Sequence, residues 1–188
     1  MLEEESNNMW ERFLSGDNAA YSWLYNEYVQ ILFRYGSHFT RDEELLKDCI
    51  QELFTTLYKN RERLGPPPHN VKVYLFVSLK NNLTHALHRQ SKYESLAHEM
   101  TSFLLEPTVE EQFIDNETDR NRHDLVEKIL QALPLRQKEI IYYRYLHELD
   151  YDEICKLMNL NYQSAQNLLQ RAIKKIRELF STDGLNES

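Results

Sequence analysis

The stretch from Asp150 to Leu179 constrains the fold most, because two runs of helical periodicity are separated there by only three residues, Asn159-Leu160-Asn161. A turn of about three residues joins two helices at a steep angle. Asn159 suits the left-handed conformation that often ends a helix, and Asn161 suits the capping position of the next helix. The sequence therefore predicts two helices that cross steeply.

The first of these helices carries its own start signal. Asp150 is placed as the N-cap and Glu153, three residues later, completes a capping-box pattern. The inward side is predicted from the helical spacing of Tyr151, Ile154, Cys155 and Met158. We expect Cys155 at the closest approach of the two helices, since a small side chain is needed there.

The last helix separates an apolar side from a polar side rich in amides. Between Tyr162 and Arg177 there are four Lys or Arg residues and no Asp or Glu. Gln and Asn can pair with adenine in the major groove, Arg can pair with guanine, and cations further along can hold phosphates. The inner stripe is predicted to be Ala165, Leu168, Leu169, Ala172, Ile173, Ile176, Leu179 and Phe180.

A polar surface helix in a bundle is the alternative interpretation of that last helix. Against it, the nearby acids Asp150, Asp152 and Glu153 are all on the preceding helix. We therefore predict a DNA-binding helix-turn-helix. Its DNA-facing residues are Tyr162, Gln163, Ser164, Gln166, Asn167, Gln170, Arg171 and Lys174.

The whole chain is predicted to be all-α, because its 188 residues include only 4 Gly and 5 Pro. No apolar run reaches the length of about 18 residues that a membrane span needs. The acidic N-terminus lacks the order of a signal peptide, so a cytoplasmic location without membrane insertion is expected. Cys49 and Cys155 have no metal-ligand spacing and are expected to be reduced core thiols.

Charge divides the chain. Residues 96–124 hold 2 basic and 8 acidic residues, whereas residues 61–95 hold 6 basic and 2 acidic ones. We therefore predict two small helical domains, at 10–90 and 125–180, joined by an acidic linker at 91–124 and followed by a disordered tail at 181–188. Three further helices are predicted outside the helix-turn-helix. A short one is expected at Glu94–Leu105 in the linker, and two more at Leu125–Leu133 and Leu135–Leu146. In the last of these, Ile140, Ile141 and Tyr145 are expected to face inward.

Four helices are predicted in the N-terminal domain, at Met9–Leu14, Asn18–Gly36, Asp42–Asn60 and Val71–Arg89. The third has an acidic outer face with Asp48, Gln51 and Glu52. The fourth has a basic, amide-bearing and aromatic face that could bind unpaired bases. Ordinary solvated helix faces remain the alternative for both.

Four segments resemble the extracytoplasmic-function (ECF) sigma factors of the bacterial sigma-70 family. They are LYNEY at Leu24–Tyr28, DCIQELF at Asp48–Phe54, VYLFVSLKNN at Val73–Asn82 and the run Leu130–Leu179. The resemblance implies a sigma factor that binds core RNA polymerase and promoter DNA. In such a protein the C-terminal domain reads the −35 element and the N-terminal domain opens the −10 element.

The resemblance also assigns roles to individual residues. The patch implied to bind the clamp of the largest polymerase subunit is Asp48, Gln51, Glu52 and Phe54, and the flap of the second-largest subunit is a further polymerase contact. The −10 residues are Tyr74, Ser78, Lys80, Asn81, His85 and Arg89. This chain departs from the common pattern at Val77, Lys80, His85 and Ala165-Gln166. An anti-sigma factor is a common partner in the family, although no residue here identifies one.

The expected function is not catalytic and needs no cofactor, metal ion or small-molecule substrate. One rival is a self-sufficient repressor or activator, which would bind paired half-sites as a dimer. Another is a metal-dependent hydrolase that uses His69, His85, His88 or His98. These histidines have no third ligand at a recognisable spacing, and the sequence has no phosphate-binding Gly loop.

Overall fold

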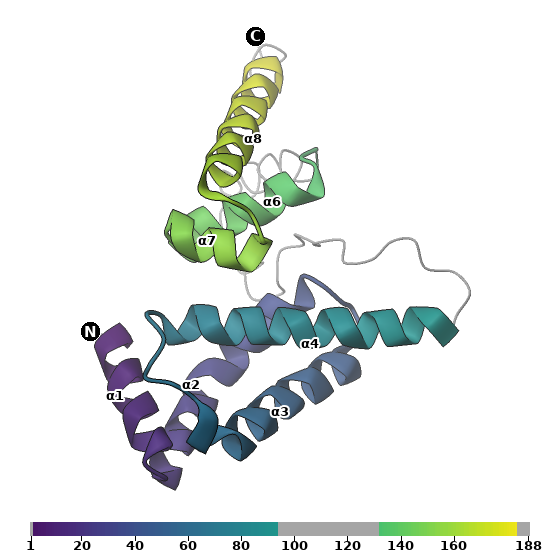
Figure 1. The fold of residues 1–188 in the computed structure, drawn as a ribbon. Helices are drawn as coiled ribbons and strands as arrows, with labels where there is room; N and C mark the ends of the chain where they lie inside the picture. The colour runs from purple at the N-terminus through teal and green to yellow at the C-terminus, as the bar shows by residue number, and fades with distance from the viewer. Residues whose placement is uncertain (1, 94–131, 184–188) are drawn as a thin grey trace, which may run out of the picture. The chain divides into compact units, whose positions relative to one another are not determined.

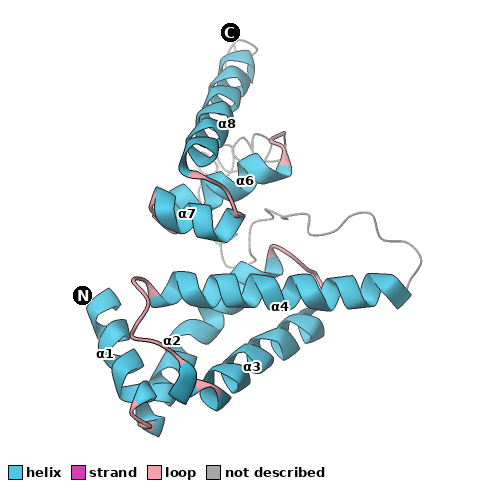
Figure 2. Cartoon of the chain, in the orientation of Figure 1, coloured by secondary structure: helices cyan, strands magenta, loops and turns pink. Residues whose placement is uncertain are grey.

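The computed structural model describes residues 2–93 and 132–183, which form helices, turns and loops without a β-strand (Figures 1 and 2). The chain divides into two compact units, Met1–Ser102 and Phe103–Ser188, and each is described by itself. The predicted all-α fold is confirmed. Most of the predicted linker, the helix expected at Glu94–Leu105, nearly all of the helix expected at Leu125–Leu133 and the last five residues lie outside the described residues.

The first unit contains all four helices predicted for it. They are α1 (Leu2–Leu14), α2 (Asn18–Ser37), α3 (Glu43–Lys59) and α4 (Val71–Tyr93), with a short 3-10 helix, η1 (Arg61–Arg63), after α3. Helix α1 begins seven residues earlier than the predicted Met9, so the packed unit starts before residue 10. Helix α4 ends four residues later than the predicted Arg89, inside the stretch predicted as linker.

The early start of α1 has a packing reason. Ser6, Trp10 and Phe13 share one face of the helix and all three are buried. The Ser6 hydroxyl is hydrogen-bonded to the hydroxyl of Tyr28 on α2, at 2.7 Å. Because this buried face begins with a polar serine, the pattern of apolar residues does not reveal the first turns of α1.

Side chains of the preceding loops start the helices of this unit. Asp17 caps α2 by accepting from the backbone N–H of Ala19 at 2.8 Å. Asp42 caps α3 by accepting from Leu45 N–H at 3.0 Å, and Asn70 Oδ1 accepts from Val73 N–H at 3.2 Å in the first turn of α4. Each cap satisfies a backbone donor that the helix itself leaves unpaired.

Aromatic contacts between helices hold the core of this unit. Tyr35 on α2 and Phe76 on α4 stack with ring centroids 4.0 Å apart, and neither is accessible to solvent. Close to this stack, α2 and α3 approach so closely at Gly36 that a Cβ there would overlap the side chain of Leu46. The first unit therefore depends on contacts between residues far apart in the sequence.

The second unit contains α6 (Leu135–Ile141), α7 (Tyr151–Met158) and α8 (Tyr162–Asp183). Between α6 and α7 the chain forms a π-helix, η3 (Tyr142–Leu146), in the second half of the predicted helix 135–146. The backbone N–H of His147 donates to Tyr142 O at 3.3 Å, five residues back.

The π-helix changes which residues face the core. Tyr142 and Tyr143 are buried, whereas Tyr145 is 57% exposed, so the prediction that Tyr145 faces inward is wrong. The wider turn gives each residue a smaller rotation than an α-helix does, and a wheel drawn at 100° per residue therefore misplaces Tyr145. Ile140 and Ile141 are buried as predicted.

Helix α8 is longer than the helices packed against it. Ala165, Leu169 and Ala172 are buried, but the stripe beyond them is covered less than predicted. Ile173, Ile176 and Leu179 are half-buried, and Phe180 is 46% exposed. Among the described helices the difference follows from length, since α8 has 22 residues while α6 and α7 have 7 and 8. Residues 181–183 are helical, so the disordered tail predicted for 181–188 does not begin at 181.

Candidate nucleic-acid interface

The turn between α7 and α8 has the predicted geometry. Asp150 and Glu153 form a reciprocal capping box, with N–H to carboxylate distances of 2.8 and 2.9 Å. Asn159 ends α7 in the left-handed conformation, at φ 50° and ψ 54°. Asn161 Oδ1 then accepts from Ser164 N–H at 2.8 Å and starts α8. Local hydrogen bonds therefore fix how α8 leaves α7.

A further bond ties α6 to this turn. The Arg136 guanidinium donates to the carbonyl of Met158, the last residue of α7, at 2.9 Å. This carbonyl is among those that a helix leaves unpaired at its C-terminus. Arg136 thus stabilises the helix-turn-helix, a role that its sequence position alone did not indicate.

Most of the residues predicted to face DNA lie on the exposed side of α8. Ser164 and Gln166 are half-buried, and the others are exposed: Tyr162, Gln163, Asn167, Gln170, Arg171 and Lys174. The Tyr162 ring lies 5.2 Å from the ring of Tyr151 on α7. Two of the three acids at the start of α7, Asp150 and Glu153, are engaged in the capping box. The exposed face carries amides and cations, and its first acid along α8 is Glu178, 3.9 Å from the Lys174 ammonium group. Such a face suits contact with bases and phosphates.

Three of these side chains are ordered by bonds along the helix. Gln163 Nε2 donates to Asn167 Oδ1 at 3.1 Å, and Arg171 Nε donates to Asn167 O at 3.2 Å. A shallow hollow of about 490 Å³ is lined by Asn167, Gln170, Arg171 and Lys174. The amides thus come first along α8, and the cations follow one to two turns later.

The position of Cys155 differs from its prediction. The buried face of α7 is formed by Ile154, Leu157 and Met158, with the Glu153 side chain also buried, and Cys155 is only half-buried. Burial, followed by the charges of Asp152 and Asp150, raises the pKa of the Cys155 thiol. Helix α7 has only two turns, so the side chains that pack most deeply are set by the angle at which α8 crosses it.

On α4, half of the predicted −10 residues lie at the surface. Asn81, His85 and Arg89 are exposed, and they succeed one another at spacings of four residues. Lys80 is half-buried, and its ammonium group lies 5.6 Å from the centroid of the Phe39 ring. The exposed residues form a basic and amide-bearing stripe on the C-terminal half of the helix.

Two other predicted −10 residues have roles inside the unit. The Tyr74 ring meets Trp10 of α1 edge to face, with centroids 5.2 Å apart, and is half-buried. The Ser78 hydroxyl donates to the Tyr74 carbonyl at 2.9 Å. The stripe predicted from the sequence therefore included residues that are not exposed, because α1 covers the N-terminal part of α4.

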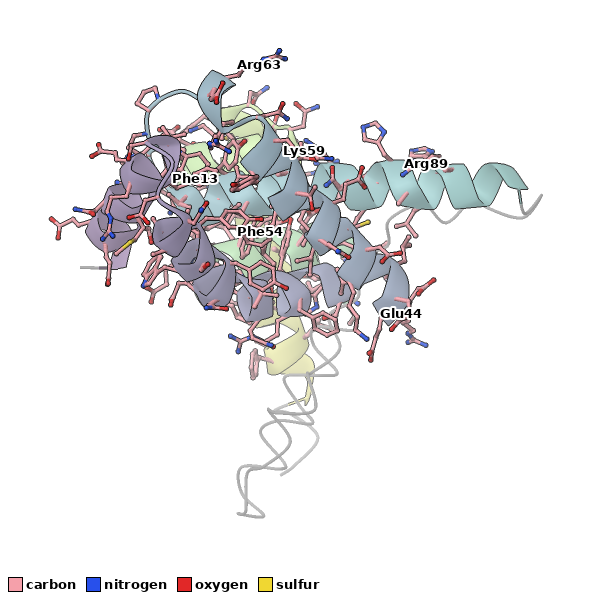
Figure 3. All side chains as sticks on the ribbon, turned by 90° about the horizontal axis from the view of Figure 1, so that it is seen from below. Phe13, Glu44, Phe54, Lys59, Arg63 and Arg89 are labelled. Carbon is pink, nitrogen blue, oxygen red and sulfur yellow. The ribbon has the colours of Figure 1, made fainter. Side chains whose placement is uncertain are left out.

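A hollow of about 600 Å³ lies between α3 and α4. Its lining is formed by Glu52 from α3 and by Asn82, His85, His88 and Arg89 from α4. Asn82 was not among the predicted site residues, although its spacing of three and seven residues from His85 and Arg89 puts it on their side of the helix. Figure 3 shows Arg89 on α4, close to the neighbouring helix α3. The hollow joins the acidic face of α3 to the basic stripe of α4.

The acidic face of α3 is exposed as predicted at Asp48, Gln51 and Glu52. Phe54 is different, because it is 1% exposed and its ring lies 4.9 Å from that of Tyr25 and 6.3 Å from that of Tyr21. Figure 3 shows Phe54 among the packed side chains of the unit. Phe54 therefore packs mainly within the unit and supports the face from there.

An aromatic groove borders this face and was missed by the sequence analysis. It has a volume of about 590 Å³ and lies between α2 and α3. Its lining residues are Tyr21, Tyr25, Val29, Phe33, Lys47, Ile50, Gln51, Phe54 and Thr55. The spacing of Tyr25, Val29 and Phe33 by four residues is the signal that would have found it. Gln51 belongs both to the groove and to the exposed face.

The described residues contain no group of three or more His, Cys, Asp or Glu side chains arranged to hold a metal ion. Across the same residues, no helix is both long and apolar enough to cross a membrane.

Cys49 is buried, as predicted. Its burial, followed by the charges of Glu52 and Asp48, raises the pKa of the Cys49 thiol.

Family comparisons agree with this two-part arrangement. Residues 24–93 match the family described as sigma-70 region 2, and residues 123–176 match sigma-70, region 4. The ECF RNA polymerase sigma factor SigM of Bacillus subtilis (strain 168) is 23% identical over 165 residues. That alignment covers 87% of this chain and 96% of SigM.

Solved structures show the same fold. CnrH, in complex with the cytosolic domain of CnrY, has a TM-score of 0.58 at 15% identity, covering 95% of this chain and 99% of that one. The sigma factor RpoE of Bartonella quintana, in complex with the anti-sigma factor NepR, has a TM-score of 0.59 at 15% identity, covering 86% and 97%. The chain belongs to the sigma-70 family and is an ECF-type sigma factor that directs promoter-specific transcription initiation.

Proposed function

We propose that the two units divide promoter recognition between two surfaces. In this proposal α8 reads the −35 element, α4 holds the opened −10 element, and the acidic face of α3 binds the clamp of the largest polymerase subunit. The protein is then a binding factor and not an enzyme, with no need for a cofactor, metal ion or small-molecule substrate. It works in the cytoplasm, where polymerase and chromosome meet.

The observation that carries the proposal is the hollow between α3 and α4. Glu52 belongs to the face proposed for polymerase, while His85 and Arg89 belong to the stripe proposed for DNA, and all three line the same hollow. DNA held on α4 would therefore lie directly beside the polymerase surface. Such adjacency suits a factor that opens DNA only as part of the polymerase complex.

The −10 surface consists of the C-terminal half of α4. Asn81 and His85 can hydrogen-bond to the edges of unpaired bases, and Arg89 can hold a phosphate or stack on a base. Tyr74 and Ser78 act through the packing of α4 and not through DNA, because their contacts lie within the unit.

Polymerase contacts are proposed on both units. On the first unit, Asp48, Gln51 and Glu52 offer a polar surface beside the aromatic groove, which suits a helical partner with basic and apolar side chains. On the second unit, Tyr145 and Leu146, the last two residues of the π-helix η3, are 57% and 56% exposed. These apolar side chains suit the flap of the second-largest subunit.

An anti-sigma factor is a further proposed partner. CnrH and RpoE, which share this fold, were each solved with a protein partner, and for RpoE that partner is an anti-sigma factor. The aromatic groove between α2 and α3 offers a surface for a competing protein. Its overlap with the proposed polymerase face, at Gln51, would make the two partners exclusive.

Pull-down and run-off transcription with core polymerase test the proposal. Reversing the charge of Asp48 or Glu52 to Lys should abolish both the complex and the transcript, because each side chain is exposed on the proposed face. Glu44→Lys is the matched control, with the same charge change on the same helix. Glu44 is exposed, pairs with Lys47 at 2.8 Å and lies at the other end of α3 from Lys59 (Figure 3).

Two outcomes would overturn the surface assignment. One is that Glu44→Lys impairs polymerase binding as strongly as Glu52→Lys does. The other is that the purified chain binds promoter duplex tightly and specifically without polymerase, as a self-sufficient dimeric regulator would.

A further inference from the structure

Two amides on the outer face of α8 form a linked pair. Gln163 and Asn167 lie one helical turn apart and are both exposed. Gln163 Nε2 donates to Asn167 Oδ1 at 3.1 Å. Amide pairs at this spacing stabilise a helix surface modestly, so the two side chains favour this relative arrangement before DNA is bound.

The bond sets the polarity of what the pair presents. It uses a donor of Gln163 and an acceptor of Asn167, and it leaves Gln163 Oε1 as an acceptor and Asn167 Nδ2 as a donor. Each amide alone could rotate to offer either group. The linked pair keeps Gln163 Oε1 as a free acceptor nearer the start of α8 and Asn167 Nδ2 as a free donor a turn later, and the second N–H of Gln163 Nε2 lies between them in the chain of amides.

We propose that the linked pair acts as one specificity unit that reads an adenine edge in the major groove. Gln163 Oε1 accepts from the adenine N6 amino group, and Asn167 Nδ2 donates to adenine N7. Guanine presents two acceptors on the same edge, so its O6 would oppose Gln163 Oε1. This inference rests on the proposed reading of the −35 element by α8.

The neighbouring cations support this assignment. Arg171 Nε donates to the Asn167 carbonyl at 3.2 Å, one turn beyond the pair. Arg171 and Lys174 line the same hollow as Asn167, which places phosphate-binding charge next to the amides. Base and backbone contacts can then form together, and the prior order of the amides lowers the entropy lost on binding.

The experiment is run-off transcription by the complete holoenzyme on a promoter library with all four bases at each −35 position. Gln163→Ala and Asn167→Ala should each lower discrimination at the same single position by roughly tenfold or more, the range of a lost paired contact. The double variant should lose no more than either single variant, because two residues that act as one unit are not additive.

Gln163→Glu tests the polarity with almost no change in shape. The new carboxylate can only accept, so Asn167 must turn to donate one of its two Nδ2 N–H groups to it. The free N–H donors of the pair then fall from three to one, and the pair becomes mainly an acceptor. The preference at that position should shift from adenine towards cytosine, whose N4 amino group is a donor. Gln30→Ala, which removes an exposed amide from α2, is the matched control and should leave the base preference unchanged.

Separate results distinguish failure of this inference from failure of the proposed function. If the parent chain gives no polymerase-dependent transcript, the proposed function falls, and the inference falls with it. If the parent chain is active but the two Ala variants affect different positions, add their losses or leave selectivity intact, only the linked pair is overturned. Circular dichroism of each variant checks that α8 remains folded.

Discussion

The two helices proposed to contact DNA, α4 and α8, are stabilised in different ways. Helix α8 is set by neighbours in sequence: the Asp150–Glu153 capping box, the left-handed Asn159 and the Asn161 cap. Helix α4 is set by residues far away, since α1 contributes Trp10 against Tyr74 and α2 contributes Tyr35 against Phe76.

This difference affects how much surface each helix exposes. On α8 six of the eight predicted residues are exposed, because the short helices beside it leave its outer face open. On α4 only three of the six predicted residues are exposed, because α1 and α3 both cover part of it. A locally defined motif can therefore be assigned from sequence more completely than a surface that depends on long-range packing.

The most severe test of long-range packing is Trp10→Ala. Trp10 is 2% exposed and touches both Phe13 and Tyr74, so its loss should lower the stability of the first unit by about 3–5 kcal/mol. The chain has two tryptophans, Trp10 and Trp23, and both lie in the first unit. Trp23 fluorescence during urea unfolding therefore reports on that unit. A midpoint equal to that of the parent chain would show that α1 is dispensable.

Gly36→Ala tests the close approach of α2 and α3. The added Cβ would overlap Leu46, which is itself buried, so we expect a loss of about 1–3 kcal/mol despite the better helix propensity of Ala. Gly65→Ala is the control, because a Cβ at Gly65 meets nothing within 4 Å. Thermal unfolding followed by Trp fluorescence measures both. Equal melting temperatures for the two variants would contradict the close packing.

Asp150→Ala tests the local stabilisation of the second unit. The substitution removes the N-cap of α7 and should cost about 1 kcal/mol in that unit, without moving the Trp transition of the first. Far-UV circular dichroism together with Trp fluorescence separates the two units. A shift of the Trp transition would mean that the first unit depends on the cap in the second.

The smallest effect is expected from pH at Asp17. A hydrogen bond from Arg12, with others from the Ala19 and Ala20 N–H groups, lowers the pKa of Asp17 below its usual range. The stabilisation is therefore complete above the unfolded pKa and is lost as pH falls through the folded one. Asp17→Asn keeps a capping side chain that does not titrate in this range. Between pH 5 and pH 3 its melting temperature should fall slightly less than that of the parent chain, and identical curves would exclude this contribution.

The sequence predicted most of the fold because helix starts and stops are local signals. Asp150, Glu153, Asn159 and Asn161 all act within four residues of their own position, and each has its predicted role. Helices α2 and α3 likewise begin within one residue of the predicted starts. The all-α class and the helix-turn-helix were predictable for this reason.

What the sequence missed depends on contacts that periodicity does not encode. The exposure of Tyr145 follows from a π-helix, which breaks the 100° rotation on which the prediction relied. Phe54 and Tyr74 are covered by side chains from α2 and α1, and the hollow at Glu52 joins two helices. Such sites are visible only when the helices are assembled.

The amide-rich start of α8 has a consequence for salt dependence. Each phosphate neutralised by a cation contributes a slope of about −0.9 to the logarithm of affinity against the logarithm of salt concentration. Gln163, Asn167 and Gln170 are neutral, so on the lining of their hollow only Arg171 and Lys174 would release counterions. Hydrogen bonds from neutral amides to bases release no counterions, so they change little with ionic strength. Base selectivity would therefore persist at salt concentrations that dissociate a DNA-binding surface rich in lysine.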